Sequence, residues 1–137
     1  MTTRKVKIIG AGSIGNHLAQ AARRMGWQVV VVDRDQGALR RMKEEIYPKR
    51  YGRWDESIEL FVSGSEPRGG FDIICVGTPP DVRLQIAEAA LAEKPRLIQL
   101  EKPLAPPLLT SLPNFVEKVR QSGVIACAGY DHVVSQI

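Results

Sequence analysis

A glycine-rich loop near the start of the chain has the spacing of a phosphate-binding loop. Gly10, Gly12 and Gly15 follow the pattern G-x-G-x-x-G, after the apolar run 6–9 and at the start of a helical pattern. The first glycine permits a tight turn, the second lets a pyrophosphate approach the backbone, and the third lets helix and strand pack closely. The helix N-terminus offers free N–H groups and a partial positive charge. The loop therefore predicts a dinucleotide site, against the alternative of a tight turn without a ligand.

An acidic residue stands where the ribose of such a cofactor would lie. Asp33 follows four successive valines, Val29–Val32, and comes 18 residues after Gly15. A carboxylate there can accept hydrogen bonds from both adenosine ribose hydroxyls and repels a 2′-phosphate, which favours NAD. The adjacent Arg34 can pair with that phosphate, so NADP stays as the alternative.

A second group of polar residues follows the apolar run 97–100. Glu101, Lys102 and Pro103 put a carboxylate, an amine and a proline where a buried strand leaves the predicted sheet. Ligands of parallel sheets bind at the carboxyl ends of the strands, so this position predicts a site. Taken alone, the three residues would also fit a solvated turn.

The elements that must position these residues alternate between strands and helices. Apolar runs predict strands at residues 6–9, 29–32, 71–76, 97–100 and 124–128. Helical periodicity predicts helices at residues 14–25, 36–46, 81–93 and 112–121. Between them, residues 47–54 could hold a short edge strand, and Asp55 could cap a short helix through Val62. The alternation predicts an α/β fold, a doubly wound parallel sheet of the Rossmann type in three layers, as a single domain over residues 1–137.

The composition is that of an ordinary globular domain. The chain has 137 residues, of which 44% are hydrophobic and 25% charged, and a net charge of +4. No aromatic–basic interleaving is present, so we expect no nucleic-acid partner. No signal peptide and no apolar run near ~20 residues are present, so we expect no membrane partner and a cytoplasmic protein. We expect no metal site, and we expect Cys75 and Cys127 to be buried and reduced.

Four motifs, in this order and spacing, resemble the nucleotide-binding domain of the glucose-fructose oxidoreductase, inositol dehydrogenase and MocA-like family. They are the loop at Gly10, Asp33-Arg34, ICVGTPP at residues 74–80 and EKPL at residues 101–104. The resemblance covers essentially the whole chain, and Glu-Lys-Pro after the fifth strand is its most specific part. It implies hydride transfer between a nicotinamide cofactor and a hydroxyl or carbonyl carbon, mostly of sugars, cyclitols and related compounds.

The resemblance also implies roles for single residues. Lys102 would lie beside the nicotinamide and hydrogen-bond the reacting substrate oxygen, which makes it the expected catalytic residue. Glu101 would lie near the nicotinamide ribose, and Thr78 and Pro79 would border the nicotinamide half of the cofactor. Together with the loop, the expected cofactor-binding residues are Gly10, Gly12, Ser13, Ile14, Gly15, Asp33, Arg34, Thr78, Pro79, Glu101 and Lys102.

Three positions depart from the pattern of the family. Arg83 stands five residues after the threonine, where many members have histidine. Leu18 stands at another common histidine position, with His17 one place early, and Val133 stands where arginine is common. We expect His17 to pack or to face solvent. His132 follows a strand end near the expected cleft, and its role as an acid–base group stays open.

The largest departure is length. The family has a second, mostly antiparallel substrate domain after the sixth strand, and this chain stops at Ile137. We therefore expect an amino-terminal piece that binds the cofactor and lacks efficient turnover alone. The complete protein would take a small-molecule substrate, and an oligomer stays open. The alternative functions are a stand-alone NAD(H) sensor and a regulatory or structural module without catalysis.

Overall fold

A six-stranded parallel sheet forms the centre of the protein in the computed structural model, which describes residues 3–102 and 112–128. Its strand order is β3-β2-β1-β4-β5-β6, and each neighbouring pair is parallel. The strands are β1 (Lys5–Ile9), β2 (Gln28–Asp33), β3 (Ile58–Val62), β4 (Ile73–Val76), β5 (Leu97–Leu100) and β6 (Ile125–Ala128). The order reverses direction between β1 and β4, which confirms the predicted doubly wound α/β fold.

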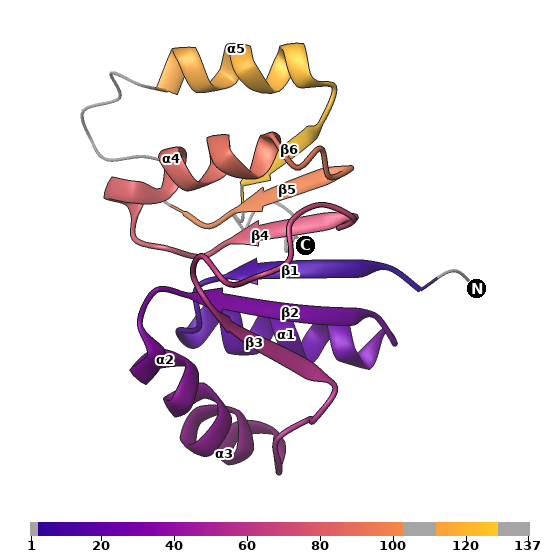
Figure 1. The fold of residues 1–137 in the computed structure, drawn as a ribbon, viewed down its shortest axis with the longest axis vertical. Coiled ribbons are helices and arrows are strands. Elements are labelled where there is room, and N and C mark those ends of the chain that lie inside the picture. The colour runs from indigo at the N-terminus through magenta and orange to yellow at the C-terminus, as the bar shows by residue number, and fades with distance from the viewer. Residues whose placement is uncertain (1–2, 103–111, 129–137) are drawn as a thin grey trace, which may run out of the picture.

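Helices cover both faces of the sheet and complete the three layers (Figure 1). The helices are α1 (Ser13–Arg24), α2 (Gln36–Arg41), the π-helical segment η1 (Met42–Ile46), α3 (Tyr47–Tyr51), α4 (Pro80–Leu91) and α5 (Leu112–Ser122). One buried cluster joins α4 and α5 to the sheet, and a second joins α1, α2 and η1 to its other side. The two halves of the chain thus each contribute one helical layer.

The four valines of β2 show why the sheet is buried on both sides. Val29 and Val31 belong to the cluster under α1, whereas Val30 and Val32 belong to the cluster under α4. Strands buried on both faces appear in the sequence as continuous apolar runs, which is how β2 could be predicted. Its last residue, Asp33, is then delivered to the carboxyl edge of the sheet.

The segment between β2 and β3 differs from the sequence expectations. Residues 47–51 continue the preceding helix as α3 and form no edge strand, because Tyr47 is buried and packs edge-on against Tyr51 and Trp54, at 4.9 and 5.2 Å between ring centroids. The expected helix through Val62 is also wrong. The Asp55 carboxylate accepts a hydrogen bond from the Ser57 amide at 2.9 Å and closes a turn, after which the chain extends into β3.

The two cysteines have different surroundings. Both are free thiols; Cys75 is buried in β4, whereas Cys127 is exposed on the edge strand β6. Burial raises the pKa of the Cys75 thiol to about 12. The expectation of burial is therefore confirmed for Cys75 and wrong for Cys127, because β6 lies at the sheet edge, where the neighbouring Ile125 is 65% exposed.

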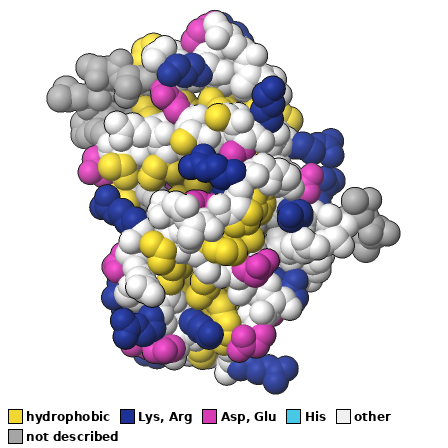
Figure 2. All heavy atoms as spheres, in the orientation of Figure 1, with side chains coloured by type: hydrophobic (Ala, Val, Ile, Leu, Met, Phe, Trp, Pro, Cys, Tyr) yellow, Lys and Arg dark blue, Asp and Glu magenta, His cyan; other side chains and the backbone are white. Residues whose placement is uncertain are grey.

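Charged side chains of both signs are scattered over the face of the molecule shown in Figure 2, and Lys and Arg lie among Asp and Glu there. Within the described ranges, no group of three or more His, Cys, Asp or Glu side chains could hold a metal ion. None of the helices in the same ranges has the length and apolar character that a membrane span requires.

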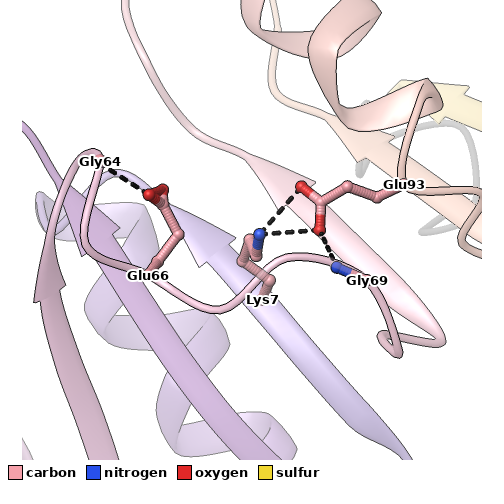
Figure 3. Close-up of polar contacts among 5 residues, drawn as sticks. All are labelled: Lys7, Gly64, Glu66, Gly69 and Glu93. Atoms are coloured by element: carbon pink, nitrogen blue, oxygen red, sulfur yellow. Dashed lines mark hydrogen bonds and ion pairs between the residues drawn. The ribbon is translucent and has the colours of Figure 1, made fainter.

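A buried ion pair holds the connection between β3 and β4 over β1 (Figure 3). The side chains of Lys7 and Glu93 are only 2% and 8% exposed, and the Lys7 Nζ lies 2.9 Å from both carboxylate oxygens of Glu93. One of these oxygens also accepts a hydrogen bond from the Gly69 amide at 2.8 Å. The Lys7 Nζ further lies 4.8 Å from the centroid of the Phe71 ring. This ion pair therefore links β1, the connection between β3 and β4, and the segment that follows α4.

Neutralising Glu93 should destabilise the fold strongly. Glu93→Gln leaves the Lys7 ammonium buried without its counter-charge, which typically costs about 3–5 kcal/mol of unfolding free energy. Glu88→Gln is the matched control, because Glu88 lies on α4 in an exposed pair with Lys118, 3.1 Å apart, worth about 1 kcal/mol or less. Urea denaturation of both variants measures the difference. Equal stabilities would show that the Lys7–Glu93 pair does not hold the connection.

Candidate functional site

A cleft of about 460 Å³ opens where the carboxyl ends of β1, β2 and β4 meet. This is the edge at which open α/β sheets bind ligands. Its walls come from the glycine loop, the end of β2 and the turn between β4 and α4. The lining residues are Ile9, Gly10, Gly12, Val32, Asp33, Arg34, Ala38, Ser63, Gly77, Thr78, Pro79, Val82, Gln85 and Ile86. Six of the predicted cofactor residues are thus brought together in one cleft.

The glycine loop fits between two strands and a helix because Gly10 and Gly15 have no side chains. A Cβ on Gly15 would lie 1.9 Å from the carbonyl oxygen of Gly10, which confirms the close packing expected at this position. Gly10 has a φ of +115° and lies against Gly77, so a Cβ there would be 3.1 Å from the Gly77 oxygen. A Cβ on Gly12 would meet no atom within 4 Å. Gly12 therefore leaves open space beside the loop, where a phosphate group could lie.

The first turn of α1 presents unused donors to this space. Gly12 is the N-cap residue, no side chain caps the helix, and no acidic residue lies in its first turn. The first amides of a helix have no partner within the helix, so those of Ser13 and Ile14 are suited to an anion. Arg50 of α3 adds a positive charge nearby: its guanidinium donates to the carbonyl of Ser13 at 3.0 Å and to its hydroxyl at 2.9 Å. Sequence reasoning missed Arg50 because α3 was not expected to be a helix.

Asn16 is a second residue that the sequence analysis missed. It is fully buried, and its Nδ2 donates to the carbonyl oxygens of Ala11 and Gly12 at 3.2 and 2.8 Å. The side-chain amide of Asn16 therefore holds the backbone of the glycine loop in place. A polar residue on the small-residue face of α1, beside Gly15 and Ala19, is the signal that could have revealed it.

Asp33 has a structural task in addition to the predicted one. Its Oδ2 accepts from the Ala11 amide at 2.9 Å, and its Oδ1 accepts from the Asp35 amide at 2.8 Å. Asp33 thus ties the glycine loop to the end of β2. Each carboxylate oxygen can accept more than one hydrogen bond, so the half-buried carboxylate keeps capacity for a ribose hydroxyl. Arg34 is exposed beside it at the cleft.

The turn after β4 carries a buried hydroxyl. The Oγ1 of Thr78 is buried and has no hydrogen-bond partner among the residues that the structure describes. Buried polar atoms are normally paired, so this atom is a candidate contact for a bound molecule. Thr78 and Pro79 both line the cleft.

Glu101 and Lys102 lie beside this turn but do not line the cleft. β5 pairs with β4, and the Glu101 amide donates to the Val76 carbonyl at 3.1 Å, so the chain leaves the sheet next to Thr78. Glu101 is half-buried and Lys102 is exposed. Pro103, His132 and Val133 fall outside the described residues.

Arg83 joins the two strand ends. It is only 4% exposed, its Nε donates to the Thr78 carbonyl at 2.9 Å, and its Nη1 donates to the Glu101 carbonyl at 2.5 Å. Its Nη2 also donates to the Thr78 carbonyl. The sequence marks Arg83 only as a departure from the histidine common in similar sequences, and the structure shows that it is part of the site's support.

A larger groove lies elsewhere and is a weaker candidate. It measures about 750 Å³ and is lined by α1 residues and by the aromatic and charged residues of segment 47–57, including Tyr51 and Trp54. No residue of the glycine loop lines it. His17 is exposed on α1 nearby, and its Nδ1 lies 3.4 Å from the Tyr51 hydroxyl, which agrees with the expectation that it packs or faces solvent.

Comparison with known proteins identifies a family. A model described as an oxidoreductase family with an NAD-binding Rossmann fold matches residues 4–130. No curated protein matches the chain in sequence.

Solved structures share the fold at low sequence identity. A UDP-N-acetylglucosamine 3-dehydrogenase from Acidithiobacillus ferrooxidans has a TM-score of 0.72 and 18% identity, and the match covers 98% of this chain and 39% of that one. A quinate dehydrogenase from Corynebacterium glutamicum in complex with NAD has a TM-score of 0.58 and 17% identity, over 91% of this chain and 44% of that one. A conserved hypothetical protein from Pyrococcus furiosus has a TM-score of 0.60 and 19% identity, over 96% of this chain and 97% of that one. The chain thus spans 39% and 44% of the two dehydrogenases.

A methyl group added at Gly12 should weaken cofactor binding, whereas one added at Gly15 should lower the stability of the fold. Gly12→Ala places a Cβ in open space and should leave the melting temperature unchanged, but it should weaken NADH binding by roughly tenfold or more, about 1.4 kcal/mol, because the methyl occupies the phosphate space. Gly15→Ala drives a Cβ into the Gly10 carbonyl and should destabilise the protein. Thermal melts and calorimetric titration with NADH measure both effects. Wild-type affinity in Gly12→Ala would show that the phosphates do not lie at this loop.

Proposed function

This chain belongs to the Gfo/Idh/MocA-type oxidoreductase family with its NAD-binding Rossmann fold, and from that premise we propose how it holds its cofactor and what it does. The pyrophosphate lies in the space beside Gly12 at the start of α1, the adenosine ribose lies against Asp33, and the nicotinamide half lies along Thr78 and Pro79. The observation that carries this proposal is the cleft itself, which collects these residues from three separate elements.

The charges and donors of the cleft support a dinucleotide. The pyrophosphate of NAD is negatively charged, and the helix end beside Gly12 has amides without partners inside the helix, with the guanidinium of Arg50 bonded to Ser13. At the other side of the loop, the Asp33 carboxylate favours ribose hydroxyls and disfavours a 2′-phosphate. The buried Oγ1 of Thr78 would gain a hydrogen-bond partner from the nicotinamide half.

For the complete protein we propose hydride transfer to or from a hydroxyl or carbonyl carbon of a sugar, a cyclitol or a related compound. When bound, NAD+ would accept the hydride from a hydroxyl carbon, and NADH would donate it to a carbonyl carbon. Lys102, just after β5 at the same edge of the sheet, is the proposed catalytic residue: its ammonium holds the reacting oxygen and stabilises the negative charge that develops on it. The support for this role is the Glu101-Lys102-Pro103 motif. Because the chain spans 39% of the Acidithiobacillus dehydrogenase, we assign turnover to the complete protein and cofactor binding to the chain itself.

A stand-alone NAD(H)-binding module is the second candidate. One observation favours it: the match to the Pyrococcus furiosus protein covers 97% of that chain, so the fold also occurs at about this length. Such a module would bind NAD(H) at the same cleft without turning over a substrate. Activity measurements on the complete protein therefore separate the two candidates.

Asp33 should set the preference for NAD over NADP. Asp33→Ser removes the carboxylate that repels a 2′-phosphate and lets Arg34 pair with it, which should shift the ratio of the two affinities toward NADP by roughly tenfold. The ratio is the informative quantity, because loosening the Ala11 contact affects both cofactors alike. Adding Arg34→Ala should cancel the gain for NADP. Dissociation constants of the single and double variants decide this, and an unchanged ratio would rule out the ribose contact.

Lys102 should matter for turnover and little for cofactor binding. In the complete protein, Lys102→Met should lower the rate by ~10²–10³, because a charged donor at the developing oxyanion is lost, while NAD affinity stays within a few fold. Lys102→Arg, which keeps the charge, is the control and should retain more activity than the methionine variant. NADH formation with a panel of sugars and cyclitols is the assay. Full activity of Lys102→Met would show that the Glu101-Lys102-Pro103 motif is a turn without a catalytic role. Absence of turnover by the wild type on every compound would favour the binding module.

A further inference from the structure

We propose that Arg83 is a positioning residue that sets the geometry of the nicotinamide half of the site, an inference that rests on the proposed function. Arg83 lies in the first turns of α4, behind the cleft-lining turn at Thr78. It does not line the cleft itself, so its effect on a bound cofactor would pass through the backbone that it holds.

The guanidinium bridges the two segments that directly follow the paired residues of β4 and β5. The register of β4 and β5 ends at the pair Val76 and Leu100, and one further backbone hydrogen bond, from the Glu101 amide to the Val76 carbonyl, follows it. Beyond that point, the Arg83 Nε donates to the Thr78 carbonyl at 2.9 Å and its Nη1 to the Glu101 carbonyl at 2.5 Å. Arg83 therefore extends the connection between the two strands by hydrogen bonds from a third element.

The chemistry of the side chain suits this task. A guanidinium is a planar fork with five donors, so it can bind two carbonyl groups at once in a fixed geometry, which a lysine ammonium cannot reproduce. Burying a charged group is costly unless it is hydrogen-bonded, and Arg83 is 4% exposed. The carbonyl groups of Thr78 and Glu101 offset part of that cost, and they do so only while both stay where they are.

The two carbonyl groups belong to residues with different places in the site. Thr78 contributes a buried hydroxyl beside the cleft, whereas Glu101 directly precedes Lys102. A shift of either segment would change the distance between the nicotinamide half and the proposed catalytic lysine. Displacements of about 1 Å can lower a reaction rate by ~10². A residue that fixes this distance therefore contributes to the rate without touching the substrate.

The test separates positioning from general stabilisation by using two ligands on the 137-residue chain. AMP occupies only the Gly12–Asp33 part of the site, whereas NADH also requires the Thr78 turn. Arg83→Gln should bind AMP within about twofold of wild type and NADH about tenfold more weakly, because hydrogen bonds from a charged donor are lost. Amide hydrogen exchange at Glu101, whose N–H is bonded to Val76, should become faster even without ligand.

Leu91→Ala is the matched control. Leu91 is buried at the other end of α4, so its truncation should lower the melting temperature without changing the ratio of NADH to AMP affinity or the exchange at Glu101. Arg83→Lys keeps the charge but lacks the planar fork of the guanidinium. It should show the same changes in smaller size, and it replaces Arg83→Gln if that variant does not fold.

Three results would overturn an assignment. Wild-type NADH affinity with unchanged exchange at Glu101 in the Arg83 variants would overturn the positioning role. Equal losses of AMP and NADH affinity would also overturn it, because Arg83 would then act through overall stability. Failure of the wild-type chain to bind either ligand would overturn the proposed function instead, and the exchange at Glu101 would still decide whether Arg83 holds the strand ends.

Discussion

The contact between Gly15 and the Gly10 carbonyl is the constraint on which the rest of the site depends. Because a Cβ at position 15 would lie 1.9 Å from that oxygen, α1 can begin against the end of β1 only with glycine there. Gly10 in turn takes a positive φ and lies against Gly77 at the end of β4. The helix N-terminus is thereby brought to the point where the strand order reverses, which is where a parallel sheet can offer a ligand both backbone amides and side chains from neighbouring strands.

The same groups serve structure and binding at this edge. Asp33 holds the loop through the Ala11 amide, and Asn16 holds it through the Ala11 and Gly12 carbonyls. A loop fixed in this way presents its amides without further ordering when a ligand arrives, so little conformational entropy has to be lost on binding. At the opposite side of β1, the pair of Lys7 and Glu93 keeps the long connection after β3 in place. The cleft is therefore bounded by backbone that side chains already restrain.

Some of this structure could be predicted from the sequence, and the reasons are physical. Val29–Val32 and residues 97–100 form continuous apolar runs because strands inside a parallel sheet are covered by neighbouring layers, and the glycine loop carries its geometry in local spacing. Residues 47–51 form a helix and no edge strand because a tertiary aromatic cluster decides their conformation, and residues 58–62 form a strand and no helix because the Asp55 carboxylate closes a turn before them. Buried cations were missed for a related reason. Lys7 and Arg83 would be solvated in isolation, and contacts with residues distant in sequence, the Glu93 carboxylate and the Glu101 carbonyl, help to offset the cost of burying them.

The fold alone does not decide between an oxidoreductase and a binding module, because structures with this fold range from a domain of a dehydrogenase to a chain of about the same length as this one. A module that only binds NAD(H) needs the glycine loop, Asp33 and the turn at Thr78, and all of these line the cleft. It has no need of a defined position for the segment after β5. In this chain, however, the buried Arg83 donates hydrogen bonds to the carbonyl groups of both Thr78 and Glu101, and Glu101 directly precedes Lys102. In the proposed function, this restraint keeps the segment after β5 at a fixed distance from the turn at Thr78.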